Sequence, residues 1–211
     1  MNHTEFVEEI IKRLKKVYPT ATCTLQYEDP VQLLIATRLA AQCTDKRVNQ
    51  VTPSLFERFP TIESFANAQP EEVEPYIYSC GFYHSKAKDI VNLCRTLLND
   101  YDGVVPDTIE ELVLLPGVGR KTANLIVGDI FKKPSVVTDT HCIRISNRLG
   151  LSSSDNPSVC EKQLRKVLPE KESSDFCHRI VEFGRDTCHS RSPKCEECVL
   201  SDICPKNGLK K

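Results

Sequence analysis

The sequence has no excess of positive charge, because its 211 residues include 28 lysines and arginines against 29 aspartates and glutamates. The formal net charge of −1 excludes a uniformly basic protein, so any anion-binding surface has to be local. No apolar run approaches the roughly 18 residues of a membrane span, and the first twenty residues lack an apolar signal-peptide core. We therefore expect a cytoplasmic protein without a membrane contact.

Alternating apolar and polar residues, the pattern of a β-strand, are also nearly absent. Apolar residues at helical spacing recur instead, as in Phe6, Ile10, Leu14 and Val17, which share one face of a first helix. The pair Asp29-Pro30 is typical of a helix start. Later helices are predicted over residues 31–41, 87–97, 123–130, 139–149, 157–168 and 174–187.

These patterns predict an all-α fold made of two helical lobes. One domain is expected to span residues 21–134, and the other to be discontinuous and to join residues 1–20 to residues 135–211. Charge is unevenly distributed, since residues 115–150 hold six lysines and arginines against two aspartates. That stretch is the candidate for binding an anion.

Eleven cysteines, an odd number, cannot all pair in disulfides. In a reducing compartment, metal ligation or buried thiols are more common. Cys188, Cys195, Cys198 and Cys204 place four soft ligands in seventeen residues, which suits zinc or an iron–sulfur cluster. Structural zinc usually uses two close pairs, whereas only Cys195 and Cys198 form such a pair here, so the spacing leans mildly toward a cluster.

The segment L-P-G-V-G at residues 115–119 lies between two predicted helices. Its glycines permit positive φ and leave the backbone uncovered, so a phosphate can meet bare N–H groups at the start of a helix. A plain connection between helices is the alternative. The candidate contact residues are Pro116, Gly117, Val118, Gly119 and Arg120.

Lys121 follows in the first turn of the next helix, where the helix dipole disfavours a cation. A free lysine has a pKa near ~10.4, so only on the order of 0.1% is neutral near pH 7. Desolvation and a helix N-terminus both lower that value and can make the amine a nucleophile. Taken alone, the residue is better explained as a solvated lysine that contacts a phosphate.

The segment V-V-T-D-T-H at residues 136–141, with L-P-G-V-G-R-K-T-A at 115–123 and the cysteine tail, resembles the endonuclease III family of helix–hairpin–helix DNA glycosylases. The resemblance extends upstream to L-A-A-Q-C-T-D at residues 39–45 and G-F-Y-H-S-K-A at 81–87, and so covers nearly the whole chain. It implies a 4Fe-4S cluster held by the four tail cysteines.

The resemblance assigns Lys121 as the nucleophile and Asp139 as the essential acid; Asp139 alone would be interpreted as an N-cap. An amine that attacks C1′ of the deoxyribose releases the base, and the resulting imine allows β-elimination 3′ to the lesion. Family members without this lysine generally use water and leave the strand intact. The resemblance therefore implies a bifunctional DNA glycosylase and AP lyase of base excision repair.

A base inside a duplex hides its sugar, so the nucleotide has to flip out and something has to fill the space. Gln42 matches the family's inserting glutamine and Phe82 its wedge, although an aliphatic wedge is more usual, which leaves the opposite-base preference open. Arg191 and Lys194 are the candidate phosphate contacts of the cysteine loop, and His141 is a candidate contact near the base.

The resemblance implies oxidised pyrimidines and abasic sites in double-stranded DNA as substrates, and we expect a monomer associated with the nucleoid. An adenine-excising relative would lack Lys121 and carry a further C-terminal domain. A noncatalytic DNA-binding module is the alternative from another class, in which Lys121 only contacts a phosphate.

Overall fold

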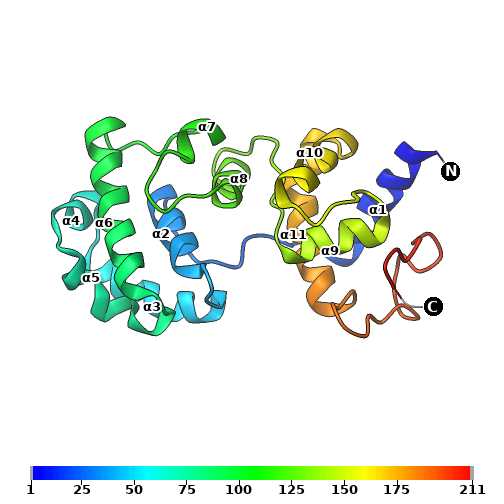
Figure 1. Ribbon diagram of the computed structural model, residues 1–211, viewed down its shortest axis with the longest axis horizontal. Helices are drawn as coiled ribbons and strands as arrows, with labels where there is room; N and C mark the ends of the chain where they lie inside the picture. The colour runs from blue at the N-terminus through cyan, green and yellow to red at the C-terminus, as the bar shows by residue number, and fades with distance from the viewer. Residues whose placement is uncertain (1, 210–211) are drawn as a thin grey trace. The chain divides into compact units, whose positions relative to one another are not determined.

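The computed structural model describes residues 2–209, and throughout that range the regular structure is helical, without a β-strand (Figure 1). The all-α prediction is therefore confirmed. Contacts divide the chain into two compact units. The first unit combines the chain up to Thr22 with the chain from Lys132 onward, and the second runs from Cys23 to Phe131.

The second unit is built around α6 (Tyr83–Asp100), an 18-residue helix. Two short helices, α4 (Ile62–Asn67) and α5 (Pro70–Ile77), pack along it, as Figure 1 shows. The remaining elements complete the core; they are α2 (Pro30–Ala40), α3 (Asp45–Arg58), the 3₁₀ turn η1 (Tyr78–Cys80), α7 (Ile109–Leu112) and α8 (Arg120–Asp129).

Local capping fixes where α2 begins. The Asp29 carboxylate accepts a hydrogen bond from the backbone N–H of Gln32 at 2.8 Å, and Pro30 occupies the first helical position. The N-cap oxygen satisfies an N–H that the helix itself leaves unpaired, and proline costs nothing where no such bond exists. The start that Asp29-Pro30 predicts is confirmed.

The first unit contains α1 (His3–Val17), α9 (Thr140–Leu149), α10 (Pro157–Val167), the 3₁₀ turn η2 (Glu170–Glu172) and α11 (Ser173–Asp186). Helix α11 packs against both α1 and α9. Ile10 and Leu14 are buried as predicted, but Val17 is 42% exposed. Tyr18, four residues after Leu14, packs on the core instead and contacts the Phe183 ring edge-on.

After α11 the chain continues as a loop that carries the last four cysteines. Helix α1 holds this loop, because the Arg13 guanidinium donates to the Asp202 carboxylate at 2.5 Å and to the carbonyl of Val199 at 2.8 Å. Leu200 is fully buried beneath it. Within residues 2–209, no helix is both long and apolar enough to cross a bilayer.

Candidate functional site

The glycine-rich segment forms a tight turn between α7 and α8. Gly117 has a φ of +73°, which only glycine adopts without strain, and Gly119 is the N-cap of α8. Glycine offers no side chain to cap the helix, and nothing lies within 4 Å of where a Cβ on Gly119 would stand. The first N–H groups of α8 therefore lie open to an anion.

An ion pair supports this turn from behind. The Arg38 guanidinium of α2 lies 2.6 Å from the Asp89 carboxylate of α6, and Gly117 passes directly over both side chains. Because α2, α6 and α8 all belong to the core of this unit, the pair fixes the turn to a rigid frame.

Lys121 is the second residue of α8, and its side chain is exposed. The position beside the positive end of the helix dipole is as predicted from the sequence. The burial that the sequence analysis considered for this amine is not found within this unit.

Asp139 is the N-cap of α9, where its Oδ1 accepts from the backbone N–H of Cys142 at 2.7 Å. The interpretation of this residue as an N-cap is therefore confirmed. A carboxylate has a second oxygen, and capping by Oδ1 leaves Oδ2 available to exchange a proton. The side chain is half-buried.

A basic pocket opens beside Asp139 within the same unit. It has an empty volume of about 860 Å³ and is lined by His141, Arg191 and the further basic side chains Arg144, Arg185 and His189. Two of the predicted DNA-contacting residues, His141 and Arg191, are thus brought together. Lys194 does not line this pocket, because it extends along the neighbouring cysteine site with its ammonium exposed.

The three additional basic residues were missed by the sequence analysis. Arg144 follows His141 by one helical turn, which is a signal that the sequence carries, and its Nη2 donates to the carbonyl of Cys188 at 2.9 Å. Arg185 and His189 join it only through folding, because they come from α11 and the loop after it.

Gln42 and Phe82 are both exposed and both adopt left-handed backbone conformations, with φ values of 55° and 50°. Phe82 is the N-cap of α6 and is 69% exposed. A large apolar side chain that is exposed to water on a strained backbone does not stabilise the fold. Such residues are typical of sites that contact a ligand.

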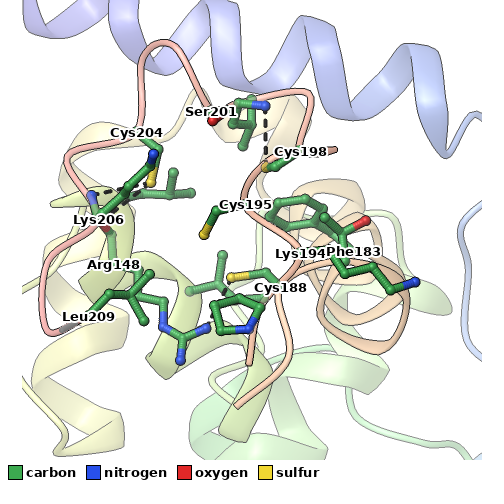
Figure 2. A pocket seen from close by; sticks show the side chains of 15 residues that line it. Arg148, Phe183, Cys188, Lys194, Cys195, Cys198, Ser201, Cys204, Lys206 and Leu209 are labelled. Carbon is green, nitrogen blue, oxygen red and sulfur yellow. Dashed lines mark hydrogen bonds between the residues drawn. The ribbon is translucent and has the colours of Figure 1, made fainter. Parts of the chain in front are cut away.

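The four tail cysteines line one pocket with an empty volume of about 390 Å³, and Figure 2 shows their thiols turned toward its centre. None of the four forms a disulfide. In a zinc site the sulfurs would lie only ~3.8 Å apart around one ion, since each Zn–S bond is about 2.3 Å. Within residues 2–209, no group of three His, Cys, Asp or Glu side chains is placed to hold a single metal ion. Four thiolates are the donor set that a 4Fe-4S cluster takes, and the four cysteines that line this pocket supply it.

Hydrogen bonds to sulfur support this fit. The backbone N–H groups of Leu200 and Lys206 donate to the Cys198 and Cys204 sulfurs, each at 3.4 Å. Burial raises the pKa of both thiols, and these N–H donors oppose that rise because they stabilise the thiolate. The thiolate is the form in which cysteine binds a metal.

Arg148 is a further residue that the sequence analysis missed. It is buried, and its Nη1 donates to the Cys188 sulfur at 3.2 Å and to the carbonyl of His189 at 2.6 Å. Its Nη2 donates to the carbonyl of Ser190 at 2.9 Å. One guanidinium thus fixes both the first cysteine and the start of the loop between Cys188 and Cys195.

Comparison with known proteins agrees with this geometry. Residues 35–170 match the HhH-GPD superfamily of base excision DNA repair proteins, and residues 188–204 match the iron–sulfur binding domain of endonuclease III. The chain is 48% identical over 198 residues to endonuclease III of Synechocystis sp., which covers 93% of this chain and 90% of that protein. The chain belongs to the endonuclease III family.

Other members of the family are similar over the same extent. Endonuclease III of Bacillus subtilis is 40% identical over 97% of this chain and 94% of its own length. A solved structure of a trapped endonuclease III–DNA covalent intermediate, in an estranged-adenine complex, is 41% identical with a TM-score of 0.90, over 98% of this chain and 97% of that one.

As a member of the endonuclease III family, the protein is a DNA glycosylase and AP lyase of base excision repair. Its partner is DNA, and its cofactor is a 4Fe-4S cluster. The match over residues 188–204 begins at Cys188 and ends at Cys204, so it contains all four cysteines of the pocket. The zinc alternative is thereby excluded.

Proposed function

We propose that Lys121 forms the covalent bond to the damaged nucleotide. The observation that carries this proposal is the position of Lys121 in the first turn of α8, beside the open N–H groups of that turn. A phosphate bound at Gly119 brings the adjoining sugar within reach of a side chain that is exposed on the same helical turn. The trapped covalent state of a solved relative supports the same chemistry.

One amine carries out both base release and strand cleavage. The neutral Nζ of Lys121 attacks C1′, the glycosidic bond breaks, and the base leaves with the electron pair and takes up a proton. Nitrogen loses its proton as the sugar ring opens, which leaves a protonated imine between Nζ and C1′. Loss of a C2′ proton then breaks the bond from C3′ to oxygen and cuts the strand 3′ to the site. Water hydrolyses the imine and releases Lys121.

We assign proton transfer in these steps to Asp139. Its Oδ2 accepts the proton that Lys121 gives up and stabilises positive charge on the deoxyribose as the base departs. The N-cap bond to Cys142 holds the carboxylate in one orientation during both events. The 4Fe-4S cluster supplies structural support to the loop when it is bound, and no step of the reaction is assigned to it.

Phosphate contacts provide the grip on DNA. The hairpin residues Pro116 to Arg120 contact one stretch of the DNA backbone, where Gly117 and Gly119 offer main-chain N–H groups, while His141, Arg191 and Lys194 contact another. Because these charges are local, affinity is expected to fall steeply with salt although the net charge is −1.

Gln42 and Phe82 are proposed to fill the space that the flipped nucleotide leaves. Gln42 hydrogen-bonds the unpaired base, and Phe82 intercalates or stacks beside the opposite strand. We propose oxidised pyrimidines and abasic sites as the substrates, and a monomer acting at the nucleoid as the working form. The domain of residues 21–134 supplies the nucleophile, and the domain of residues 1–20 plus 135–211 supplies the acid.

Reduction with borohydride in the presence of abasic duplex DNA tests the proposal, because it converts the imine into a stable amine. The wild-type protein is expected to give a covalent adduct, and Lys121→Ala to give none while it still binds DNA. Lys162→Ala, which removes an exposed lysine of α10, is the matched control and is expected to be trapped like the wild type. A wild-type protein that forms no adduct would contradict the covalent role of Lys121, which would then only contact a phosphate.

A further inference from the structure

Lys86 is a lysine buried in the core of the second unit. It is only 1% exposed, and burial lowers the pKa of its ammonium. Its Nζ donates to the carbonyl of Leu39 at 2.8 Å and to the carbonyl of Cys80 at 2.9 Å. The proposed chemistry does not use this amine.

A buried cation needs a reason, because removing an ammonium from water is costly and an apolar side chain of similar size would fill the space without that cost. Lys86 also interrupts the apolar face of α6, on which Ile90, Cys94 and Leu97 are buried. The hydrogen-bond partners of the Lys86 ammonium are backbone carbonyls rather than a carboxylate. The ammonium therefore joins two segments of main chain.

The two segments carry the two residues proposed to enter the duplex. Leu39 lies three residues before Gln42, and Cys80 lies two residues before Phe82. Both Gln42 and Phe82 adopt left-handed backbone conformations that non-glycine residues rarely keep without support from their surroundings. The ammonium of Lys86 therefore joins the bases of the two loops at the point where each loop turns outward.

The same part of α2 is tied to α6 a second time. Arg38, the residue before Leu39, binds Asp89, which lies three residues after Lys86 on α6. Gly117 of the hairpin packs on that ion pair. The loops of Gln42 and Phe82 and the phosphate-binding turn thus share one support made of α2 and α6.

We propose that Lys86 is a positioning residue, which holds the loops of Gln42 and Phe82 at a fixed separation so that both side chains enter the duplex together. The proposal rests on the proposed roles of Gln42 and Phe82 in base flipping. In this arrangement the separation of the two loops is fixed before the protein binds DNA. Lesion recognition then depends on the hydrogen bonds of Lys86, although Lys86 does not contact the nucleic acid.

Lys86→Met tests this role, because methionine keeps most of the aliphatic stem and removes the ammonium. The expected result is an excision rate on a damaged base that is lower by about 100-fold in single turnover, as a misplacement near 1 Å can produce. Affinity for undamaged duplex DNA, which depends on phosphate contacts, is expected to change by no more than about twofold. A fluorescent adenine analogue opposite the lesion is expected to lose its unstacking signal.

Leu97→Ala is the matched control for lost stability. Leu97 is a fully buried residue of the same helix, away from both loops, and its truncation weakens the same core. If Lys86 were merely structural, the two variants would lose excision in proportion to their folded fractions, measured by thermal melting. If Lys86 positions the loops, Leu97→Ala is expected to keep the fluorescence signal after correction for its folded fraction.

A double-variant comparison adds a result that a structural role would not give. Phe82→Ala is expected to lower excision strongly in the wild-type background and to add little in Lys86→Met, since both changes remove the same insertion. Full additivity, or a Lys86→Met protein with wild-type excision and fluorescence, overturns the proposal. If Lys86→Met does not fold, Lys86→Gln replaces it, because the shorter amide keeps N–H donors to at least one carbonyl.

Failure of this inference can be told apart from failure of the proposed function. A wild-type protein that gives no borohydride adduct, or one whose Gln42→Ala and Phe82→Ala variants excise normally, contradicts the proposed function itself. The other outcome is a wild-type protein that forms the borohydride adduct and needs both Gln42 and Phe82 for excision, while Lys86→Met excises as fast as the wild type. That outcome contradicts only the role of Lys86.

Discussion

Gly117 lies so close to Arg38 that a Cβ on the glycine would stand 2.9 Å from Arg38 Cδ and 3.1 Å from its Nε. The positive φ and the close approach both require glycine at this position. The turn proposed to bind phosphate is therefore held by its contact with the Arg38–Asp89 ion pair as well as by its own backbone.

Gly117→Ala is expected to lower the free energy of unfolding by about 2 kcal/mol and to weaken binding to damaged and undamaged DNA alike, because it strains and displaces the turn. Gly119→Ala is the matched variant, since φ is −94° there and the space around it is open. It should weaken DNA binding while costing little stability. Denaturant unfolding and binding titrations would separate the two effects, and equal loss of stability in both would contradict this account.

Asp139→Asn should remove chemistry and leave the fold intact. Asparagine caps a helix about as well as aspartate, so the bond to Cys142 and the start of α9 are expected to survive. An amide cannot take up a proton as a carboxylate does, and base excision should therefore fall by at least about 100-fold. Single-turnover excision and DNA affinity are the two measurements, and equal loss of both would argue against the assigned role.

Gly184→Ala is expected to disturb the basic pocket from the opposite helix. A Cβ there would press directly on Nδ1 of His141 and stand 3.0 Å from Nη2 of Arg144, the group that binds the carbonyl of Cys188. Overpacking of this kind costs about 1–3 kcal/mol. Salt-dependent binding measurements should show weaker affinity for DNA, whereas an unchanged affinity and melting temperature would show that α11 can move away freely.

Cys198→Ser should release the cysteine loop and leave the helices formed. The residues from Cys188 to Cys204 bury few apolar side chains and contain no regular helix, so we expect them to depend on ligation in addition to the contacts of Arg13 and Arg148. Loss of the cluster's visible absorbance, a nearly unchanged helical circular dichroism and proteolytic cleavage near Arg191 are expected together. A resistant loop in the cluster-free variant would contradict this dependence.

The sequence alone determined the features that depend on a few neighbouring residues. Asp29-Pro30 starts α2, Asp139 caps α9, and the glycines at 117 and 119 shape the turn before Lys121, because capping and φ preferences act within about one helical turn. Helix α4 was not predicted, since its six residues are too few to show a periodicity.

Only the tertiary structure decided which distant residues meet. The burial of Lys86 between two carbonyls, the bond from Arg148 to the Cys188 sulfur and the close approach of Gly184 to His141 all join segments tens of residues apart or on different helices. Local preferences carry no information about such separations, because packing of whole helices sets them. The sequence therefore specified the reactive groups, and the packing of the helices set the frame that holds them.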